Sequence, residues 1–231
     1  MPCYPGQTLS EPVPHSVAKA IVRTVAYADV FDYPLTLDQV HRYLVGIRAS
    51  PSAVHNALRS EPLIRRTLAH TGGYFCLAGR EDIVQTRLRR AQIAAQLWPK
   101  ARRYATSIAS LPFVRMVAIT GTLAVDNVDS DADIDYLIVT APRRVWLARA
   151  LSIAYVHVGR LERVEICPNY VISVDALDQF DRSFYSAHEL AQMVPLYGSM
   201  FIASWFKPTD GLWHICRTRS NRTRSVPGIK P

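Results

Sequence analysis

The stretch that decides the fold covers residues 113–140 and reads FVRMVAITGTLAVDNVDSDADIDYLIVT. It opens with a compact apolar run at 113–120 and closes with a second one at 134–140. Short apolar runs bounded by turn residues are typical of buried strands. Between them lies a polar turn that starts with Gly121 and Thr122 and ends at Asp133. The pattern therefore predicts a strand, a turn and a second strand.

Two carboxylates stand at the start of the second predicted strand. Because strand side chains alternate between faces, Asp133 and Asp135 should project from one face and their apolar neighbours from the other. Two carboxylates in this arrangement can hold the divalent cations of phosphoryl transfer. Gly121 lets backbone N–H groups approach a phosphate, and the Thr122 hydroxyl adds a donor.

The acidic run also has simpler interpretations. An EF-hand loop is excluded, because counting from Asp129 the sixth residue is Ile134 rather than glycine, and the twelfth is Thr140 rather than glutamate. A solvated acidic turn is the plain alternative, since an Asp-x-Asp pair is common by chance. The chain carries 27 basic and 19 acidic residues, a net charge of +8. An acidic island in a basic, strand-flanked setting favours a metal site.

Together these residues resemble the signature of the DNA polymerase beta-type nucleotidyltransferase superfamily. In that signature an apolar residue and Gly-[Gly/Ser] precede a turn and then two acidic residues that alternate with apolar ones. This chain supplies Thr120-Gly121-Thr122, ten intervening residues, and then Asp133-Ile134-Asp135-Tyr136. The likeness is greatest to uncharacterised bacterial nucleotidyltransferase domain proteins and extends over most of residues 17–200. Thr122 stands where serine is usual.

The resemblance implies an α+β nucleotidyltransferase domain with a mixed sheet. Such an enzyme moves a nucleoside monophosphate from an NTP to an acceptor hydroxyl by two-metal catalysis and releases pyrophosphate. Asp133 and Asp135 would hold Mg²⁺, and Gly121 and Thr122 would bind the nucleotide. The acceptor, whether nucleic acid, protein or small molecule, is left open.

The superfamily usually adds a third carboxylate from a later strand. Glu165 is our first candidate, because it lies in an apolar run at 164–174 where an unpaired charge would be costly. Asp175, at the far end of that run, is the alternative. A plain role for Glu165, pairing with Arg163 or facing solvent at a sheet edge, also stays open.

The N-terminal part of the chain has the order of a winged helix-turn-helix. Helices are predicted at 17–30, 36–44 and 50–60, and strands at 63–68 and 74–77 around a Gly-Gly turn. Thr36 and Ser50 have the positions of N-caps. The module would bind nucleic acid through Asn56 and Arg59, with Arg65 and Arg66 of the wing on phosphates, or serve as a packing platform.

The sequence predicts five segments. They are a flexible arm at 1–16, a winged-helix-like domain at 17–80, a basic connecting helix at 81–110 interrupted near Pro99, a nucleotidyltransferase domain at 111–206 and a basic, disordered tail at 207–231. Within the fourth segment we expect a helix at 143–158, an edge or bulged strand containing Pro168, and a helix at 186–194 capped by Ser186 and ended by Pro195.

Composition places the chain in the cytoplasm. Its four cysteines are widely spaced, and neither a membrane span nor a signal peptide is evident. Two rival functions remain beside the transferase. One is a winged-helix DNA-binding regulator whose second domain senses a nucleotide without turnover, and the other is an inactive structural relative.

Overall fold

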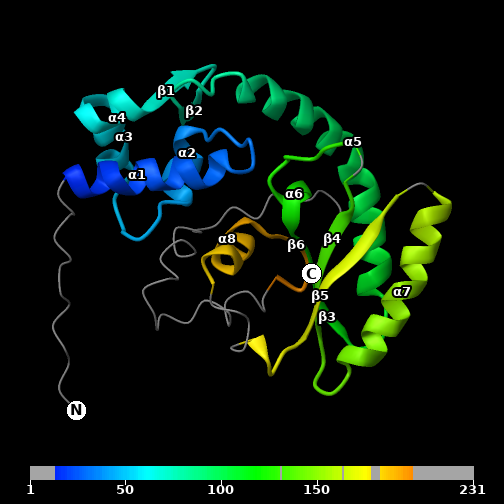
Figure 1. Ribbon diagram of the computed structural model, residues 1–231. Helices are drawn as coiled ribbons and strands as arrows, with labels where there is room; N and C mark the ends of the chain where they lie inside the picture. The colour runs from blue at the N-terminus through cyan, green and yellow to red at the C-terminus, as the bar shows by residue number, and fades with distance from the viewer. Residues whose placement is uncertain (1–13, 131, 163, 178–182, 200–231) are drawn as a thin grey trace, which may run out of the picture. The chain divides into compact units, whose positions relative to one another are not determined.

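The computed structural model describes residues 14–130, 132–162, 164–177 and 183–199, and its architecture is α+β (Figure 1). The predicted tail at 207–231 and most of the predicted arm lie outside the described residues. The chain divides into two compact units, Met1–Val84 and Gln85–Pro231. We refer to them as the N-terminal and the C-terminal unit.

Helices and one hairpin make up the N-terminal unit. They are α1 (Pro14–Asp29), α2 (Leu37–Arg42), α3 (Pro51–Ser60), α4 (Pro62–Thr67), β1 (Leu68–Thr71) and β2 (Tyr74–Leu77). Both predicted caps are confirmed: Thr36 forms a capping box with Gln39, and the Ser50 side chain accepts a hydrogen bond from the Ala53 N–H. Helix α1 begins at Pro14, three residues before the helix predicted at 17–30.

The strand predicted at 63–68 is wrong. These residues form α4, and β1 begins only at Leu68. Pro62 stands in the first turn, where its fixed φ suits a helix, and Ile64 and Leu68 are buried at helical spacing. Arg65 and Arg66 therefore lie exposed on a helix rather than on the hairpin.

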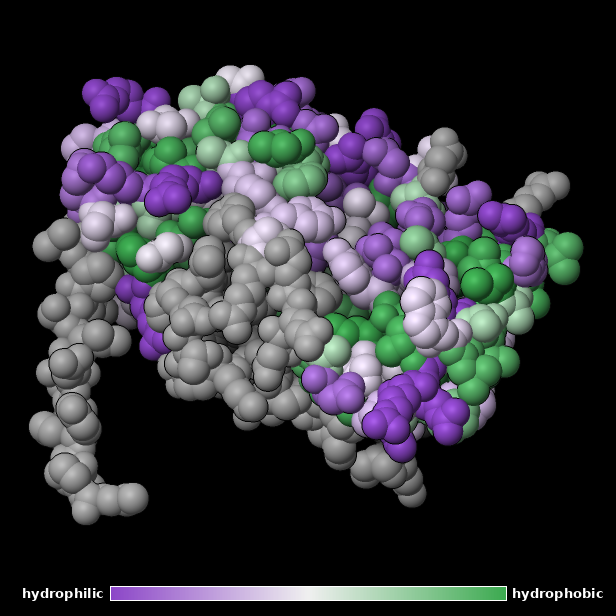
Figure 2. All heavy atoms as spheres, turned by 60° about the horizontal axis from the view of Figure 1, so that its bottom comes forward, coloured by the Kyte–Doolittle hydropathy of each residue, from purple (hydrophilic) through white to green (hydrophobic). Residues whose placement is uncertain are grey.

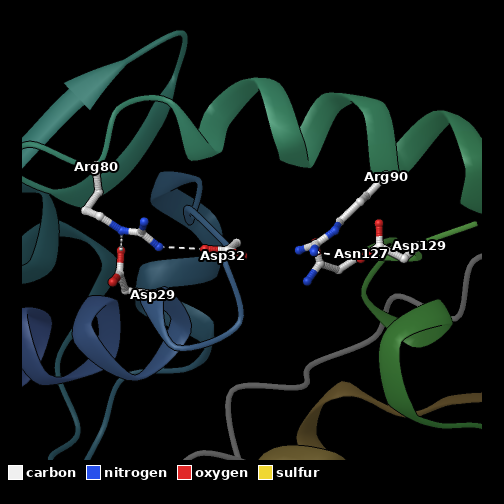
Figure 3. A network of polar contacts seen from close by, with 6 residues as sticks. All are labelled: Asp29, Asp32, Arg80, Arg90, Asn127 and Asp129. Carbon is white, nitrogen blue, oxygen red and sulfur yellow. Dashed lines mark hydrogen bonds and ion pairs between the residues drawn. The ribbon is translucent and has the colours of Figure 1, made fainter. Parts of the chain in front are cut away.

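The hairpin is tied to the helices of its own unit by backbone and charged contacts. Leu35 and Phe75 exchange two backbone hydrogen bonds of 2.9 and 2.7 Å. Beyond β2, the Arg80 guanidinium contacts Asp29 at 3.3 Å and Asp32 at 2.6 Å (Figure 3). These contacts hold the hairpin and the helices together in one small packed unit.

The C-terminal unit is built on a mixed sheet. Its elements are most of α5 (Ile83–Ala109), β3 (Val114–Ile119), α6 (Gly121–Ala124), β4 (Ile134–Thr140), α7 (Val145–Leu161), β5 (Ile166–Ser173), α8 (Phe184–Gln192) and β6 (Val194–Tyr197). The strand order is β5-β4-β3-β6, with β4 and β5 parallel and the other pairs antiparallel. The predicted strand at 134–140 is confirmed residue for residue.

Helix α5 covers one face of this sheet. Its Ala94, Trp98 and Ile108 share a buried core with Ile134 and Tyr136 of the sheet. The Tyr136 hydroxyl donates to the Ala101 carbonyl at 2.7 Å. The predicted interruption near Pro99 is wrong, since α5 runs through this residue as one curved helix (Figure 1). Burial of its apolar stripe outweighs the backbone hydrogen bond that proline removes.

Prolines mark both edges of the described sheet. The register between β4 and β5 shifts between Asp135 and Leu137, opposite Pro168, so the predicted edge and bulge are both confirmed.

The expected cap of α8 at Ser186 is wrong, because the Ser183 side chain accepts a hydrogen bond from the Ser186 N–H and the helix begins earlier. Pro195 lies inside edge strand β6, where its missing donor is tolerated.

The surface of the described residues mixes polar and apolar side chains. Helix α7 exposes large apolar groups, with Trp146 at 82% and Leu161 at 86% exposed. In the view of Figure 2, hydrophobic residues (green) and hydrophilic residues (purple) are both found across the coloured surface.

None of the helices described in this chain combines the length and apolar character needed to cross a membrane.

Candidate functional site

Two carboxylates and a thiol meet where β4 and β5 begin. Ligand atoms of Asp133, Asp135 and Cys167 all lie within 4.8 Å of one another, and all three residues are half-buried. Asp135 and Cys167 are register partners in the parallel β4–β5 pair. The structure thus brings the two predicted aspartates together and adds Cys167, which was not among the predicted site residues.

The backbone places these side chains on the face that points away from α5. Ile119, Ile134 and Ile166 are buried in the core beneath α5, so the residues next to them in each strand point to the opposite face. Thr120 is extended, and its N–H donates to the Asp135 carbonyl at 3.0 Å. Thr120, Asp135 and Cys167 therefore form one row across three strands.

Gly121 stands directly against the Asp135 carboxylate. Its φ is +64°, a conformation that favours glycine, and a Cβ added there would collide with the Asp135 carboxylate oxygen. Its N–H, expected to face a phosphate, donates at 3.3 Å to Glu189 Oε2. Thr122 follows as an exposed residue of α6. Glycine at position 121 thus allows the end of β3 to lie close to the start of β4.

Glu189 is the second group of the site that was not among the predicted site residues. It lies on α8 and is 7% exposed, and burial raises the pKa of its carboxyl against the opposing hydrogen bonds from Gly121 and Tyr185. His188-Glu189 is not part of a metalloprotease H-E-x-x-H motif, because Gln192 stands at the position of the second histidine. No local sequence pattern predicts that the Glu189 carboxylate accepts a hydrogen bond from the Gly121 N–H.

The site is rich in groups that carry or can carry negative charge. Burial, then Asp133 and Glu189, raise the pKa of Asp135 to about 6, although a hydrogen bond from Cys167 opposes this. Burial and the two aspartates raise the pKa of the Cys167 thiol to about 11. A cation placed among these groups would relieve the repulsion and reverse both shifts.

Neither predicted third carboxylate joins the group of three. Glu165 is exposed just before β5, where its backbone carbonyl accepts a hydrogen bond from Ile134, and its side chain is not among the clustered ligands. Asp175 follows the opposite end of β5, since the register pairs Asp135 with Cys167 and Thr140 with Ser173. Cys167 occupies the place beside Asp135 that we expected a carboxylate to take.

The loop between α6 and β4 is anchored on α5. Arg90 contacts Asp129 at 2.7 Å and Asn127 at 3.5 Å (Figure 3). The Trp98 indole N–H donates to Asp126 at 2.7 Å. These contacts fix the path of the loop that leads to Asp133 at the start of β4. They also mean that the Arg90 guanidinium binds partners within the protein.

Searches against protein-family models, curated proteins and solved structures found no match to this chain. The residues of the site and their arrangement are therefore what supports a function for this chain.

The raised pKa of Asp135 predicts how stability depends on pH. Because folding moves this pKa from 3.8 to about 6, ionisation disfavours the folded state as the pH rises through that window. In EDTA, Asp135→Asn should melt at a temperature close to the wild type at pH 4 and above it at pH 7. Thermal denaturation across this range measures the difference. A melting-temperature difference that stays the same from pH 4 to pH 7 would contradict the raised pKa of Asp135.

Proposed function

We propose that this protein is a metal-dependent nucleotidyltransferase, with the C-terminal unit as the nucleotidyltransferase domain. The reaction moves a nucleoside monophosphate from an NTP to an acceptor hydroxyl and releases pyrophosphate. The observation that carries the proposal is the strand–turn–strand unit of β3, α6 and β4. It sets Gly121 against the Asp135 carboxylate with Asp133 beside it.

The donor set fits a divalent cation, because two carboxylates converge beside a third donor, the Cys167 sulfur. Asp133 and Asp135 would hold the metal, Mg²⁺ in the resemblance that motivates the proposal. A bound divalent cation would neutralise phosphate charge and favour ionisation of the attacking hydroxyl. The burial of Asp135 strengthens its interaction with any charge that develops at the site.

The remaining groups position the nucleotide and the acceptor. The absent side chain of Gly121 lets the Asp135 carboxylate lie directly against the turn, and the exposed Thr122 can donate its hydroxyl to phosphates held there. Phosphate binding at the Gly121 N–H requires Glu189 to give up its hydrogen bond. Glu165 lies outside the group of three ligands, exposed two residues before Cys167, and we propose that it assists deprotonation of the acceptor without binding the metal.

Product analysis with the full chain tests this function. The protein is incubated with Mg²⁺, Mn²⁺, Co²⁺ or Zn²⁺, each α-³²P-labelled NTP in turn, and a cell extract as the source of acceptors. We expect pyrophosphate release together with transfer of label to one class of molecule. Absence of both products with every nucleotide would overturn the proposal and favour the nucleotide-sensing regulator, which binds without turnover.

A second function, nucleic-acid binding by the N-terminal unit, is favoured by the surface of α3. Its apolar Val54, Ala57 and Leu58 are buried, whereas Asn56 and Arg59 are exposed. An isolated antiparallel bridge between Leu35 and Phe75 ties the segment before α2 to the two-stranded hairpin. We propose that this unit is a winged helix that presents α3 to a nucleic acid.

Salt dependence of binding should reveal this role. Replacing Arg59, Arg65 and Arg66 by alanine in the full chain should flatten the log–log salt slope on duplex DNA by about 2–3 units, because each phosphate contact contributes about −0.9. The exposed Arg160→Ala serves as the control and should leave the slope unchanged. Fluorescence anisotropy with random duplex and tRNA measures it. Lack of binding at low salt would make the unit a packing platform.

A further inference from the structure

The ligand set of the candidate metal site contains a soft donor. Beside the carboxylates of Asp133 and Asp135 it offers the sulfur of Cys167, and all three ligand atoms lie within 4.8 Å of one another. Mg²⁺ selects oxygen ligands, whereas thiolates select transition metals such as Zn²⁺ and Co²⁺. Sites with three protein ligands keep a further position open for water or substrate.

A second observation points to a ligand on the same face. Thr120 is 1% exposed, and its Oγ1 is buried without a hydrogen-bond partner among the described residues. Thr120 lies opposite Asp135, as their backbone hydrogen bond shows, so its side chain shares the face that carries Asp135 and Cys167. A buried hydroxyl without a partner disfavours the folded protein unless a bound group satisfies it.

We propose that this site binds a thiophilic divalent cation, of the class of Zn²⁺ and Co²⁺, with Cys167 as thiolate ligand beside Asp133 and Asp135. Binding forms a metal–sulfur bond and releases the thiol proton to solvent. The Thr120 hydroxyl then hydrogen-bonds to a water or phosphate oxygen on the metal. This proposal rests on the proposed function, because it specifies the class of metal bound at the same site. It can be tested without measuring turnover.

Optical titration of the metal-free full chain tests the ligand set. Co²⁺ is added without nucleotide under reducing conditions, and we expect a near-ultraviolet thiolate-to-cobalt charge-transfer band. Zn²⁺ should abolish this band by competition, whereas a large excess of Mg²⁺ should leave it in place. Cys76→Ala is the matched thiol control, because Cys76 is buried in the N-terminal unit, and it should keep the band.

Variants separate ligation from a structural role. Cys167→Ser should lose the band and weaken Co²⁺ binding by more than about tenfold, with an unchanged circular dichroism spectrum. Cys167→Asp should also lose the band but bind Mg²⁺ more tightly than the wild type, because it restores an all-oxygen site. Thr120→Val should keep the band and weaken the metal affinity, which a purely structural threonine would not do.

The outcomes distinguish this inference from the proposed function. A band that depends on Cys167, in a protein that transfers no nucleotide, supports the thiolate site and counts against the transferase. Transfer with Mg²⁺ that depends on Asp135, in a protein without the band, supports the transferase and overturns the thiolate site. Equal Co²⁺ affinity of wild type and Cys167→Ser would overturn it as well.

Discussion

Asp135→Asn is expected to reduce nucleotide transfer by at least about a hundredfold while the chain stays folded. The substitution keeps the shape of the side chain and removes the charge that would hold a cation next to Gly121. Because Asp135 is a half-buried acid with a raised pKa, losing its charge should not destabilise the fold at neutral pH. Asp133→Asn should act in the same direction, since its carboxylate belongs to the same group.

Asp129→Asn is the matched control for this loss. It is the same chemical change within the loop that leads to β4, and Asp129 is exposed and pairs with Arg90. The asparagine amide oxygen can still accept a hydrogen bond from Arg90, so the loop keeps this anchor and transfer should stay near the wild-type rate. Label incorporation and pyrophosphate release are measured for all three variants under identical conditions. An Asp135→Asn protein with near-native turnover would refute the assignment of this carboxylate.

Gly121→Ala should weaken nucleotide binding by more than about tenfold, the second large effect that we expect. The new Cβ would collide with the Asp135 carboxylate, and a φ of +64° costs a non-glycine residue about 1–2 kcal/mol. Either the carboxylate or the turn must move, and both displacements disturb the place where phosphates would bind. Isothermal titration with an NTP and Mn²⁺ measures the affinity.

Gly73→Ala separates backbone strain from the collision. Gly73 has a φ of +82° but nothing within 4 Å of an added Cβ, so this variant should show only the stability loss from backbone strain and keep its nucleotide affinity. Thr122→Ser should also bind normally, because it retains an exposed hydroxyl. Thermal denaturation of the same samples reports the loss of stability. If Gly121→Ala and the wild type bound nucleotide equally, a phosphate site at this turn would be untenable.

Local patterns in the sequence were enough to predict much of the fold. The apolar run at 134–140 predicted the bounds of β4, and the two-residue period of a strand predicted the shared face of Asp133 and Asp135. Thr36 and Ser50 predicted helix starts through side-chain capping, and Pro168 predicted a bulged edge. Each of these features depends on a few neighbouring residues or on one residue's own backbone limits.

Tertiary packing decided the features in which local preference was ambiguous. Residues 63–68 have a short apolar pattern that suits a strand or a helix, and burial of Ile64 under the helices of its unit selected the helix. Pro99 lowers helix propensity, yet the apolar stripe of α5 packs on the sheet from Ala94 to Ile108 and keeps the helix continuous. Only these long-range contacts supply the free energy that overrides the local signal.

The composition of the candidate site was decided in the same way. Nothing near Cys167 in the sequence shows that it stands beside Asp135, because that placement depends on the register of a parallel pair with α7 between its strands. Glu189 likewise meets Gly121 only once α8 has packed against α6. The sequence determined the two aspartates and the glycine turn, whose chemistry lies in one continuous segment. The tertiary structure decided which thiol and which further carboxylate complete the site, since strand register and helix packing join residues that are distant in the chain.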